Sequence, residues 1–179
     1  KASENLYLIS GGEELALSKK MLSLKEMRSE LTLLDSMVSL EGEFDYVIID
    51  TSPSFDSISL NVLFYASEVL TPVSLESLSL DSLASFKKRL LTIQKYNKSL
   101  THKYLLPTFK DNRVKKSGEI LKILDKHFSE ILCDPISYSS KVSEASGHNK
   151  TIFQYCNKTI GAQDYTKLIN RVIEDEIRS

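Results

Sequence analysis

Asp50 is the side chain with the clearest chemical use, because it follows an apolar run and precedes small hydroxyl residues. Residues 46–49 have the composition of a buried strand, and Thr51 and Ser52 come directly after the carboxylate. In an open parallel sheet, the carboxyl ends of the strands border the crevice in which ligands bind. A carboxylate at that edge, with hydroxyl groups beside it, can hold Mg²⁺ and its waters against the phosphates of a nucleotide. The other interpretation is a central strand whose final Asp caps the following turn.

A phosphate-binding partner for Asp50 is absent from the sequence. The pattern that cradles nucleotide phosphates, G-x-x-x-x-G-K-S/T, does not occur. The nearest segment, residues 10–14, lacks the Gly-Lys pair and places two carboxylates where a phosphate would lie. The chain also starts at Lys1 rather than at Met. We therefore expect the back portion of a nucleotide-binding domain, with loss of the activity as the alternative.

The composition is that of an ordinary globular chain. With 179 residues, 41% hydrophobic and 26% charged, the chain is large enough for one domain with one core. No apolar run reaches the length of a membrane span, and no basic-then-apolar leader opens the chain. Cys133 and Cys156 lie far apart, so we expect two reduced thiols in a cytosolic protein rather than a disulfide. The histidines are scattered among polar residues, which argues against a metal site.

The net charge of −1 conceals opposite charges in the two halves of the chain. Residues 1–85 contain 5 Lys and Arg against 14 Asp and Glu, a net charge of −9. Residues 86–179 contain 18 Lys and Arg against 10 Asp and Glu, a net charge of +8. Such segregation favours a basic face for nucleic acid or another anionic partner. If the halves interleave in space, however, the two fields average out.

Strands and helices are expected to alternate along the chain. Runs of strand-forming residues predict short strands at residues 5–9, 46–50, 68–73, 103–107 and 131–136. Apolar residues at helical spacing predict helices at residues 14–40 (one or two), 57–65, 80–97, 119–128 and 163–177. Ser117 is a candidate N-cap, and residues 137–150 are expected to form a loop. The alternation predicts an α/β fold, a mostly parallel sheet with helices on both faces.

Short motifs occur in a fixed order along the whole chain. They are residues 5–10 (NLYLIS), 44–53 (FDYVIIDTSP), 61–63 (NVL), 68–73 (EVLTPV), 106–113 (LPTFKDNR), 136–145 (ISYSSKVSEA) and 150–165, which contains KTIFQY and GAQDY. Together they resemble the ParA family of deviant-Walker ATPases, which position plasmids, chromosomes and other cargo. Residues 44–53 resemble the family's Walker B segment, with Ser52 where proline is usual. Asn149 stands where the family has glycine, and because Asn tolerates left-handed backbone we expect that turn to survive.

The resemblance implies a P-loop NTPase-like fold that binds ATP with Mg²⁺. Residues 1–179 would be the C-terminal two-thirds of a single nucleotide-binding domain, with the N-terminal strands and the P-loop missing from this chain. Asp50 would hold Mg²⁺ through water, and Thr51 would begin a switch loop. The nucleotide site would also include Asp111, Pro135, Ile136 and Ser137 on the side of the base. The family's P-loop lysines and switch acid are absent, so no catalytic residue lies in this chain and the fragment alone is expected to be inactive.

The resemblance also implies an ATP-bound homodimer that coats double-stranded DNA without sequence preference. Lys141 aligns with a basic residue that resembles a DNA phosphate contact, and any positive side chain within reach suffices for such a contact. The same surface is expected to include Arg113, Lys115, Lys116 and Lys150. Glu144 is interpreted as an ion pair or loop anchor rather than a catalytic acid. A ParB-type centromere-binding protein would stimulate hydrolysis, and the protein would be cytoplasmic and nucleoid-associated.

Two other functions stay open at this point. One is a truncated adaptor without enzymatic activity, which would bind DNA or an intact homologue. The other is a membrane-positioning ATPase of the MinD type, a class that ends in a basic amphipathic helix. Residues 173–179 instead contain three adjacent acids, which an anionic membrane would repel, so no membrane partner is expected.

Overall fold

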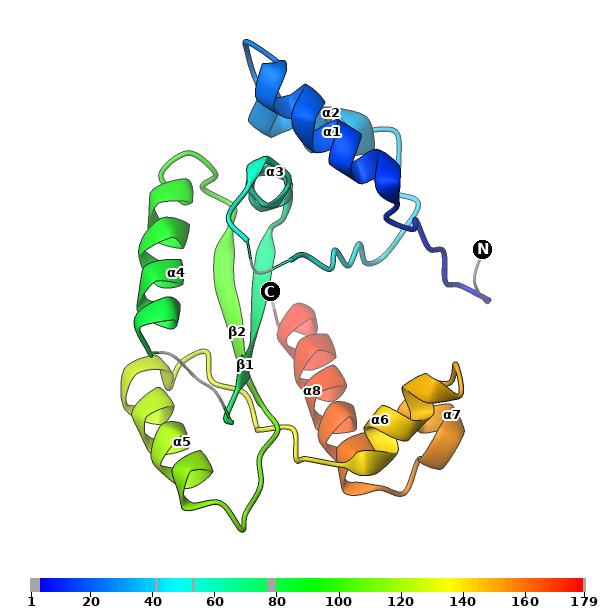
Figure 1. Cartoon of the computed structure of the whole chain (residues 1–179), viewed down its shortest axis with the longest axis vertical. Helices are drawn as coiled ribbons and strands as arrows, with labels where there is room; N and C mark the ends of the chain where they lie inside the picture. The colour runs from blue at the N-terminus through cyan, green and yellow to red at the C-terminus, as the bar shows by residue number, and fades with distance from the viewer. Residues whose placement is uncertain (1–3, 41, 53, 77–79, 179) are drawn as a thin grey trace. The chain divides into compact units, whose positions relative to one another are not determined.

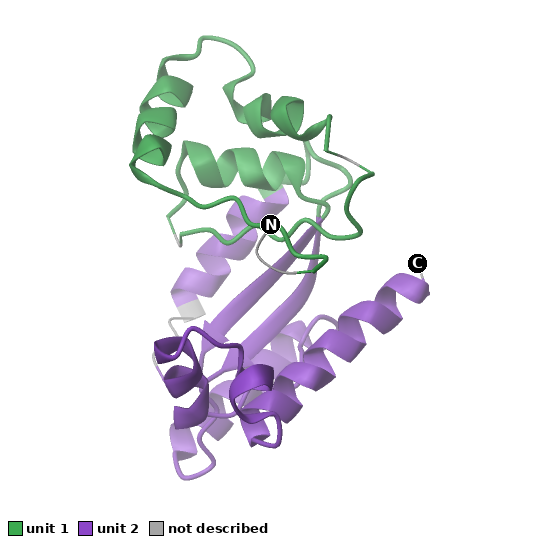
Figure 2. Ribbon diagram, turned by 90° about the vertical axis from the view of Figure 1, so that its right-hand side faces the viewer, with its two compact units in different colours: residues 1–67, 92–100 green, residues 68–91, 101–179 purple. Residues whose placement is uncertain are grey.

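The computed structural model describes residues 4–40, 42–52, 54–76 and 80–178. Pro53, part of the predicted Walker B segment, lies outside the described residues. Contacts within the chain divide it into two compact units, which Figure 2 shows in different colours. Unit 1 consists of Lys1–Ser67 and Thr92–Leu100, and unit 2 consists of Glu68–Leu91 and Thr101–Ser179. The expectation that residues 1–179 are the C-terminal two-thirds of a single domain stays a prediction.

Unit 2 is built on two parallel strands, β1 (Glu68–Ser74) and β2 (Thr101–Thr108). The ladder is regular apart from a shift between Val69 and Leu70. A parallel pair needs a long crossover connection, and α4 (Leu80–Ile93) lies in that connection. The two strands confirm the prediction of parallel strands in this part of the chain.

Helices cover both faces of this sheet. Figure 1 shows α4 and α5 (Lys115–Phe128) on one face and α8 (Ile160–Ile177) on the other. Because successive residues of a strand point to opposite faces, β2 contributes to two cores. Leu105, with 0% exposure, packs with side chains of α4 and α5, whereas Tyr104 and Leu106 pack against α8. The predicted α/β fold with a parallel sheet between helices is therefore confirmed.

Two short helices, α6 (Ser140–Gly147) and α7 (Ile152–Cys156), complete unit 2. The prediction of a loop over residues 137–150 is wrong, because α6 occupies most of it. Helices this short are not stable on their own and depend on tertiary packing. Ala145 and Ile152 supply that packing, since both are buried against the first turn of α8.

Unit 1 contains the remaining helices. They are α1 (Glu13–Leu24), the short 3₁₀ helix η1 (Ser29–Leu31), α2 (Thr32–Met37) and α3 (Ser57–Tyr65). The predicted helical region at residues 14–40 thus forms two α-helices, α1 and α2, and α3 has the predicted bounds of 57–65.

Residues 5–9 and 46–50 form no strand in the described part of the chain, so the prediction of strands there is wrong. Most of their apolar side chains are exposed, with Ile9 at 81% and Ile48 at 91%, although Ile49 is half-buried. A parallel strand needs neighbours that pair with its backbone and helices that cover its faces. Among the described residues, the ladder that forms joins β1 to β2 and leaves residues 46–50 without a partner strand.

Two smaller predictions are also wrong. Residues 131–136 form no strand, because Leu132 alone among them makes an isolated parallel bridge, to Leu105 of β2. Pro135 lacks the N–H that a ladder needs. Ser117 does not cap α5, because the helix already begins at Lys115 and Ser117 is buried inside it.

Candidate nucleotide and DNA sites

Asp50 lies in an extended segment of unit 1 that leads toward α3. Asp50, Thr51 and Ser52 are all exposed. Mg²⁺ keeps several of its waters in proteins and takes one or two carboxylates. An accessible carboxylate on an extended segment fits a contact to such a hydrated ion, with the adjacent Thr51 hydroxyl as a further polar group.

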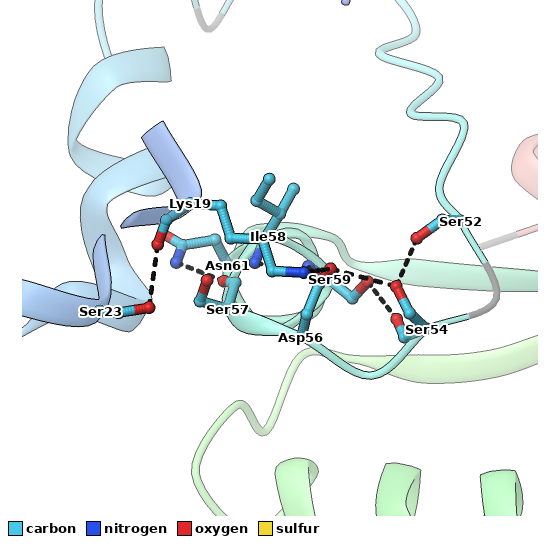
Figure 3. A network of polar contacts seen from close by, with 9 residues as sticks. All are labelled: Lys19, Ser23, Ser52, Ser54, Asp56, Ser57, Ile58, Ser59 and Asn61. Atoms are coloured by element: carbon cyan, nitrogen blue, oxygen red, sulfur yellow. Dashed lines mark hydrogen bonds and ion pairs between the residues drawn. The ribbon is translucent and has the colours of Figure 1, made fainter. Parts of the chain in front are cut away.

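Asp56 holds the end of this segment in place, and both of its carboxylate oxygens are engaged in contacts within unit 1 (Figure 3). One carboxylate oxygen accepts hydrogen bonds from the backbone N–H groups of Ile58 and Ser59, at 3.1 and 3.0 Å, and so caps α3. The Lys19 ammonium of α1 lies 2.9 Å from the other oxygen. The Ser59 N–H and Lys19 hold the pKa of Asp56 well below its usual range. Asp50, in contrast, stays accessible.

Further polar contacts attach this loop to the helices of unit 1. The Ser59 hydroxyl donates to the Ser54 carbonyl at 2.6 Å, and the hydroxyl groups of Ser52 and Ser54 lie 2.6 Å apart. The buried Asn61 amide donates to the Ser29 carbonyl at 2.8 Å, which joins α3 to η1. The loop that follows the predicted Mg²⁺ ligand is therefore anchored at its C-terminal end.

In unit 2, backbone pairing brings the predicted base-side residues together. The Lys110 N–H donates to the Ile136 carbonyl at 3.0 Å, and the Tyr138 N–H donates to the Lys110 carbonyl at 2.9 Å. These bonds set Asp111, the next residue after Lys110, beside Pro135, Ile136 and Ser137. Contact of these residues with a nucleotide stays a prediction.

Asp111 and Arg113 form a two-pronged ion pair. Arg113 Nε lies 3.0 Å from Oδ1 of Asp111, and a terminal guanidinium nitrogen lies 2.7 Å from Oδ2. The backbone N–H of Arg113 also donates to this carboxylate, at 2.9 Å. The bonds from Arg113 lower the pKa of Asp111 to about 2. A phosphate or ribose that contacts either residue must therefore share or replace this pair.

Asp164 of α8 is a positioning residue that the sequence analysis missed. Its side chain is buried, with 8% exposure for the residue, and its Oδ2 accepts the Ser137 N–H at 2.9 Å. One turn earlier, Gly161 packs so closely on α6 that an added Cβ would lie 2.8 Å from the Val142 side chain. The first turns of α8 thus hold residues 137–142 in place. The sequence did hold a signal for this role, because Asp164 is an acid within the apolar stripe of an amphipathic helix. A carboxylate buried in this way needs a hydrogen-bond donor as its partner.

Lys141, the main predicted DNA contact, lies in α6 and pairs with Glu144. The Lys141 ammonium lies 2.7 Å from Glu144 Oε2, which confirms the interpretation of Glu144 as an ion-pair residue. The hydrogen bond between them raises the pKa of Lys141 and lowers that of Glu144. Asn149 has a φ of 52°, so the predicted left-handed turn is confirmed. That turn leads directly to Lys150, which is exposed.

The other predicted DNA-contacting cations belong to a different element. Lys115 and Lys116 begin α5, and Arg113 precedes it. Lys116 donates to the Glu76 carbonyl at 3.4 Å, and Lys115 is exposed. The structure thus groups Lys141 with Lys150 around α6, and it groups the remaining cations at the start of α5.

Three further features of the described residues concern metal-binding clusters, membrane-spanning helices and cysteines. In the part of the chain that the structure describes, no cluster of three or more His, Cys, Asp or Glu side chains could enclose a metal ion. Within those same residues, no helix has the length and apolar character of a membrane span. Cys133 and Cys156 are free thiols, as predicted.

The parallel sheet covered by helices is a P-loop NTPase-like fold. A family model described as an AAA domain matches residues 1–102. The chromosome-partitioning ATPase Soj of Treponema pallidum and the sporulation initiation inhibitor protein Soj of Bacillus subtilis are each 28% identical to this chain over 171 residues. Each match covers 94% of this chain and 67% of the relative. The chain belongs to this AAA domain family and is a member of the ParA family.

A solved structure has a similar fold. Cobyrinic acid a,c-diamide synthase from Mycobacterium smegmatis with bound ADP and magnesium superposes with a TM-score of 0.68 at 28% identity. The match covers 85% of this chain and 55% of the synthase. The chain therefore spans about half to two-thirds of the length of these proteins, at 55% and 67%.

Proposed function

We propose that this protein is a partition ATPase of the ParA type, which moves a plasmid or chromosome. ATP and Mg²⁺ drive a homodimer onto nonspecific double-stranded DNA, and a ParB-type centromere-binding protein stimulates hydrolysis and release. The protein works in the cytoplasm on the nucleoid. The observation that carries this proposal is the match to a chromosome-partitioning ATPase over 94% of the chain.

The family resemblance, together with the contacts found within each unit, supports specific roles for residues of this chain. Bound ATP and Mg²⁺ would supply the reacting phosphate and its charge neutralisation. Asp50 would hold Mg²⁺ through its waters, and Thr51 would begin the switch loop, whose C-terminal end is anchored on α3. Asp111, Pro135, Ile136 and Ser137 would bind the base. The DNA surface consists of Arg113, Lys115, Lys116, Lys141 and Lys150.

The first experiment measures ATP binding and ATP-dependent retention on nonspecific duplex DNA, using the full-length product of the gene. Asp50→Ala should weaken ATP binding in Mg²⁺ and, with it, retention on DNA. Asp45→Ala is the matched control, because Asp45 is an exposed acid of the same segment. Lys141→Ala should reduce DNA retention without changing ATP binding.

The outcomes separate the proposed function from its alternatives. DNA binding that ignores ATP would identify a truncated adaptor, and retention on anionic vesicles in place of DNA would identify a membrane-positioning ATPase. If the protein binds neither ATP nor DNA, the partition function is wrong and the family membership alone stands.

A further inference from the structure

We propose that Glu144 competes with DNA phosphate for Lys141 and thereby sets the affinity of the DNA-binding surface. The inference rests on the proposed function, because it concerns the phosphate contact assigned there to Lys141. It adds to that surface a residue whose charge opposes binding.

The competition follows from the geometry of α6. Lys141 and Glu144 lie three residues apart and therefore on one face of the helix. The Lys141 ammonium lies 2.7 Å from Glu144 Oε2, and the two side chains are 49% and 40% exposed. A phosphate oxygen can reach this ammonium from solvent without opening the core. To form a close contact, however, it must either take the place of the Glu144 carboxylate or bond to another N–H of the ammonium beside that negative charge, and both weaken the contact.

A second contact keeps the Glu144 carboxylate beside Lys141. The Tyr155 hydroxyl of α7 donates to the same Oε2 at 3.0 Å. The Tyr155 ring in turn stacks on His148, with ring centroids 5.2 Å apart and planes 17° apart. The bonds from Lys141 and Tyr155 lower the pKa of Glu144, so the carboxylate stays ionised at neutral pH. Glu144 is therefore a fixed negative charge rather than a freely rotating side chain.

The size of the effect is limited by solvent. Exposed ion pairs are weak, because water and salt screen both charges. Removing the competing charge should therefore strengthen DNA binding by about two- to fivefold at low salt. The gain should shrink as salt rises, since phosphate binding itself depends on the release of counterions. Glu144 thus weakens DNA binding by a modest factor and does not block it.

The test measures the dissociation constant for nonspecific duplex DNA in the presence of ATP, for the full-length gene product over a range of salt. Glu144→Gln removes the charge but keeps the shape of the side chain, and it should tighten binding. Lys141→Gln should weaken binding. In the double variant, Glu144→Gln should give little or no gain, because its effect acts through Lys141.

Glu174→Gln is the matched control. It makes the same change in net charge and removes an exposed ion pair with Arg178, whose guanidinium lies 3.8 Å from Glu174. Glu174 lies about 20 Å along α8 from the contact of that helix with α6. Glu174→Gln should leave DNA affinity unchanged.

The possible failures are distinct. If Lys141→Gln weakens binding but Glu144→Gln changes nothing, the proposed function stands and the competition is wrong. An equal gain from Glu174→Gln, or a full gain from Glu144→Gln in the Lys141→Gln background, would show a general charge effect and overturn the competition. If no variant and no wild-type protein binds DNA, both the proposed function and this inference are wrong.

Discussion

Two segments with strand-like sequences reach different states in the two units. β2 of unit 2 pairs with β1, and its residues 104–107 are buried between helices. Residues 46–50 of unit 1 are equally apolar but have no partner strand in the described chain, and Ile48 is 91% exposed. Strand propensity largely measures how a side chain fits its neighbours. The difference shows that composition identifies a candidate strand, whereas neighbouring backbone and helices decide whether it forms.

The largest expected effect is a loss of stability, and it should distinguish a buried side chain of β2 from an exposed side chain of residues 46–50. Leu105→Ala should lower the free energy of unfolding by about 2–5 kcal/mol, because it leaves a cavity in a packed core. Ile48→Ala should change it by less than about 0.5 kcal/mol, as an exposed substitution does. Urea unfolding of the 179-residue chain measures both. A comparable loss from Ile48→Ala would mean that this segment is buried and would remove the contrast.

The sequence predicted most of the elements of unit 2, since its strands and long helices carry clear periodic patterns. The predicted helix over 57–65 also has the observed bounds of α3. α6 and α7 were missed because their stability comes from α8 rather than from their own residues. A local signal for α7 did exist, the capping box that Thr151 forms with Gln154.

The candidate site was predictable in its residue types but not in its partners. Asp50 was selected as a candidate Mg²⁺ ligand because it follows an apolar run and precedes hydroxyl residues. No local pattern shows, however, that Lys110 pairs with Ile136 and so brings Asp111 beside the base-side wall. The partner of Asp164 was unpredictable for the same reason, because the Ser137 N–H that it accepts lies 27 positions away in the sequence.

A second contrast concerns two glycines in helices of unit 2. Gly161→Ala should destabilise the protein by about 1–3 kcal/mol, because the new methyl group overpacks the contact with α6. An added Cβ there would lie 2.8 Å from Val142, whereas Gly118 of α5 has nothing within 4 Å of an added Cβ. Gly118→Ala should therefore stabilise the helix by about 0.5–1 kcal/mol. Thermal unfolding of both variants tests the close approach, and a neutral Gly161→Ala would contradict it.

Replacing Asp164, the buried carboxylate of α8, should lower the free energy of unfolding somewhat less than Gly161→Ala does. Asp164→Ala leaves the Ser137 N–H without its acceptor, at a cost of about 1–3 kcal/mol that the helix propensity of Ala partly offsets. Asp164→Asn keeps an acceptor oxygen and should lose less. Lys167→Ala is the control, since Lys167 lies 3.6 Å from Asp164 and its side chain is 61% exposed. Equal losses from Asp164→Asn and Asp164→Ala would show that the hydrogen bond is not the important contact.

The smallest expected effect lies in unit 1, at the cap of α3. Asp56→Ala should cost about 1 kcal/mol, because the N–H groups of Ile58 and Ser59 lose their acceptor. Asp56→Asn should retain most of this stability, since Asn caps helices nearly as well as Asp. Asn carries no charge, however, and cannot pair with Lys19 of α1. The two variants therefore separate the cap from the ion pair.

The dependence of this effect on pH follows from the sign of the pKa shift. The pKa of Asp56 in the folded chain lies below its ordinary value of 3.8. A depressed pKa stabilises the fold at pH values above the unfolded pKa, and this stabilisation is lost as pH falls through the folded pKa. The difference in unfolding free energy between wild type and Asp56→Asn should thus be constant near neutral pH and shrink below about pH 4. Urea unfolding across this range measures it, and a difference that grows on acidification would contradict the pairing of Asp56 with Lys19.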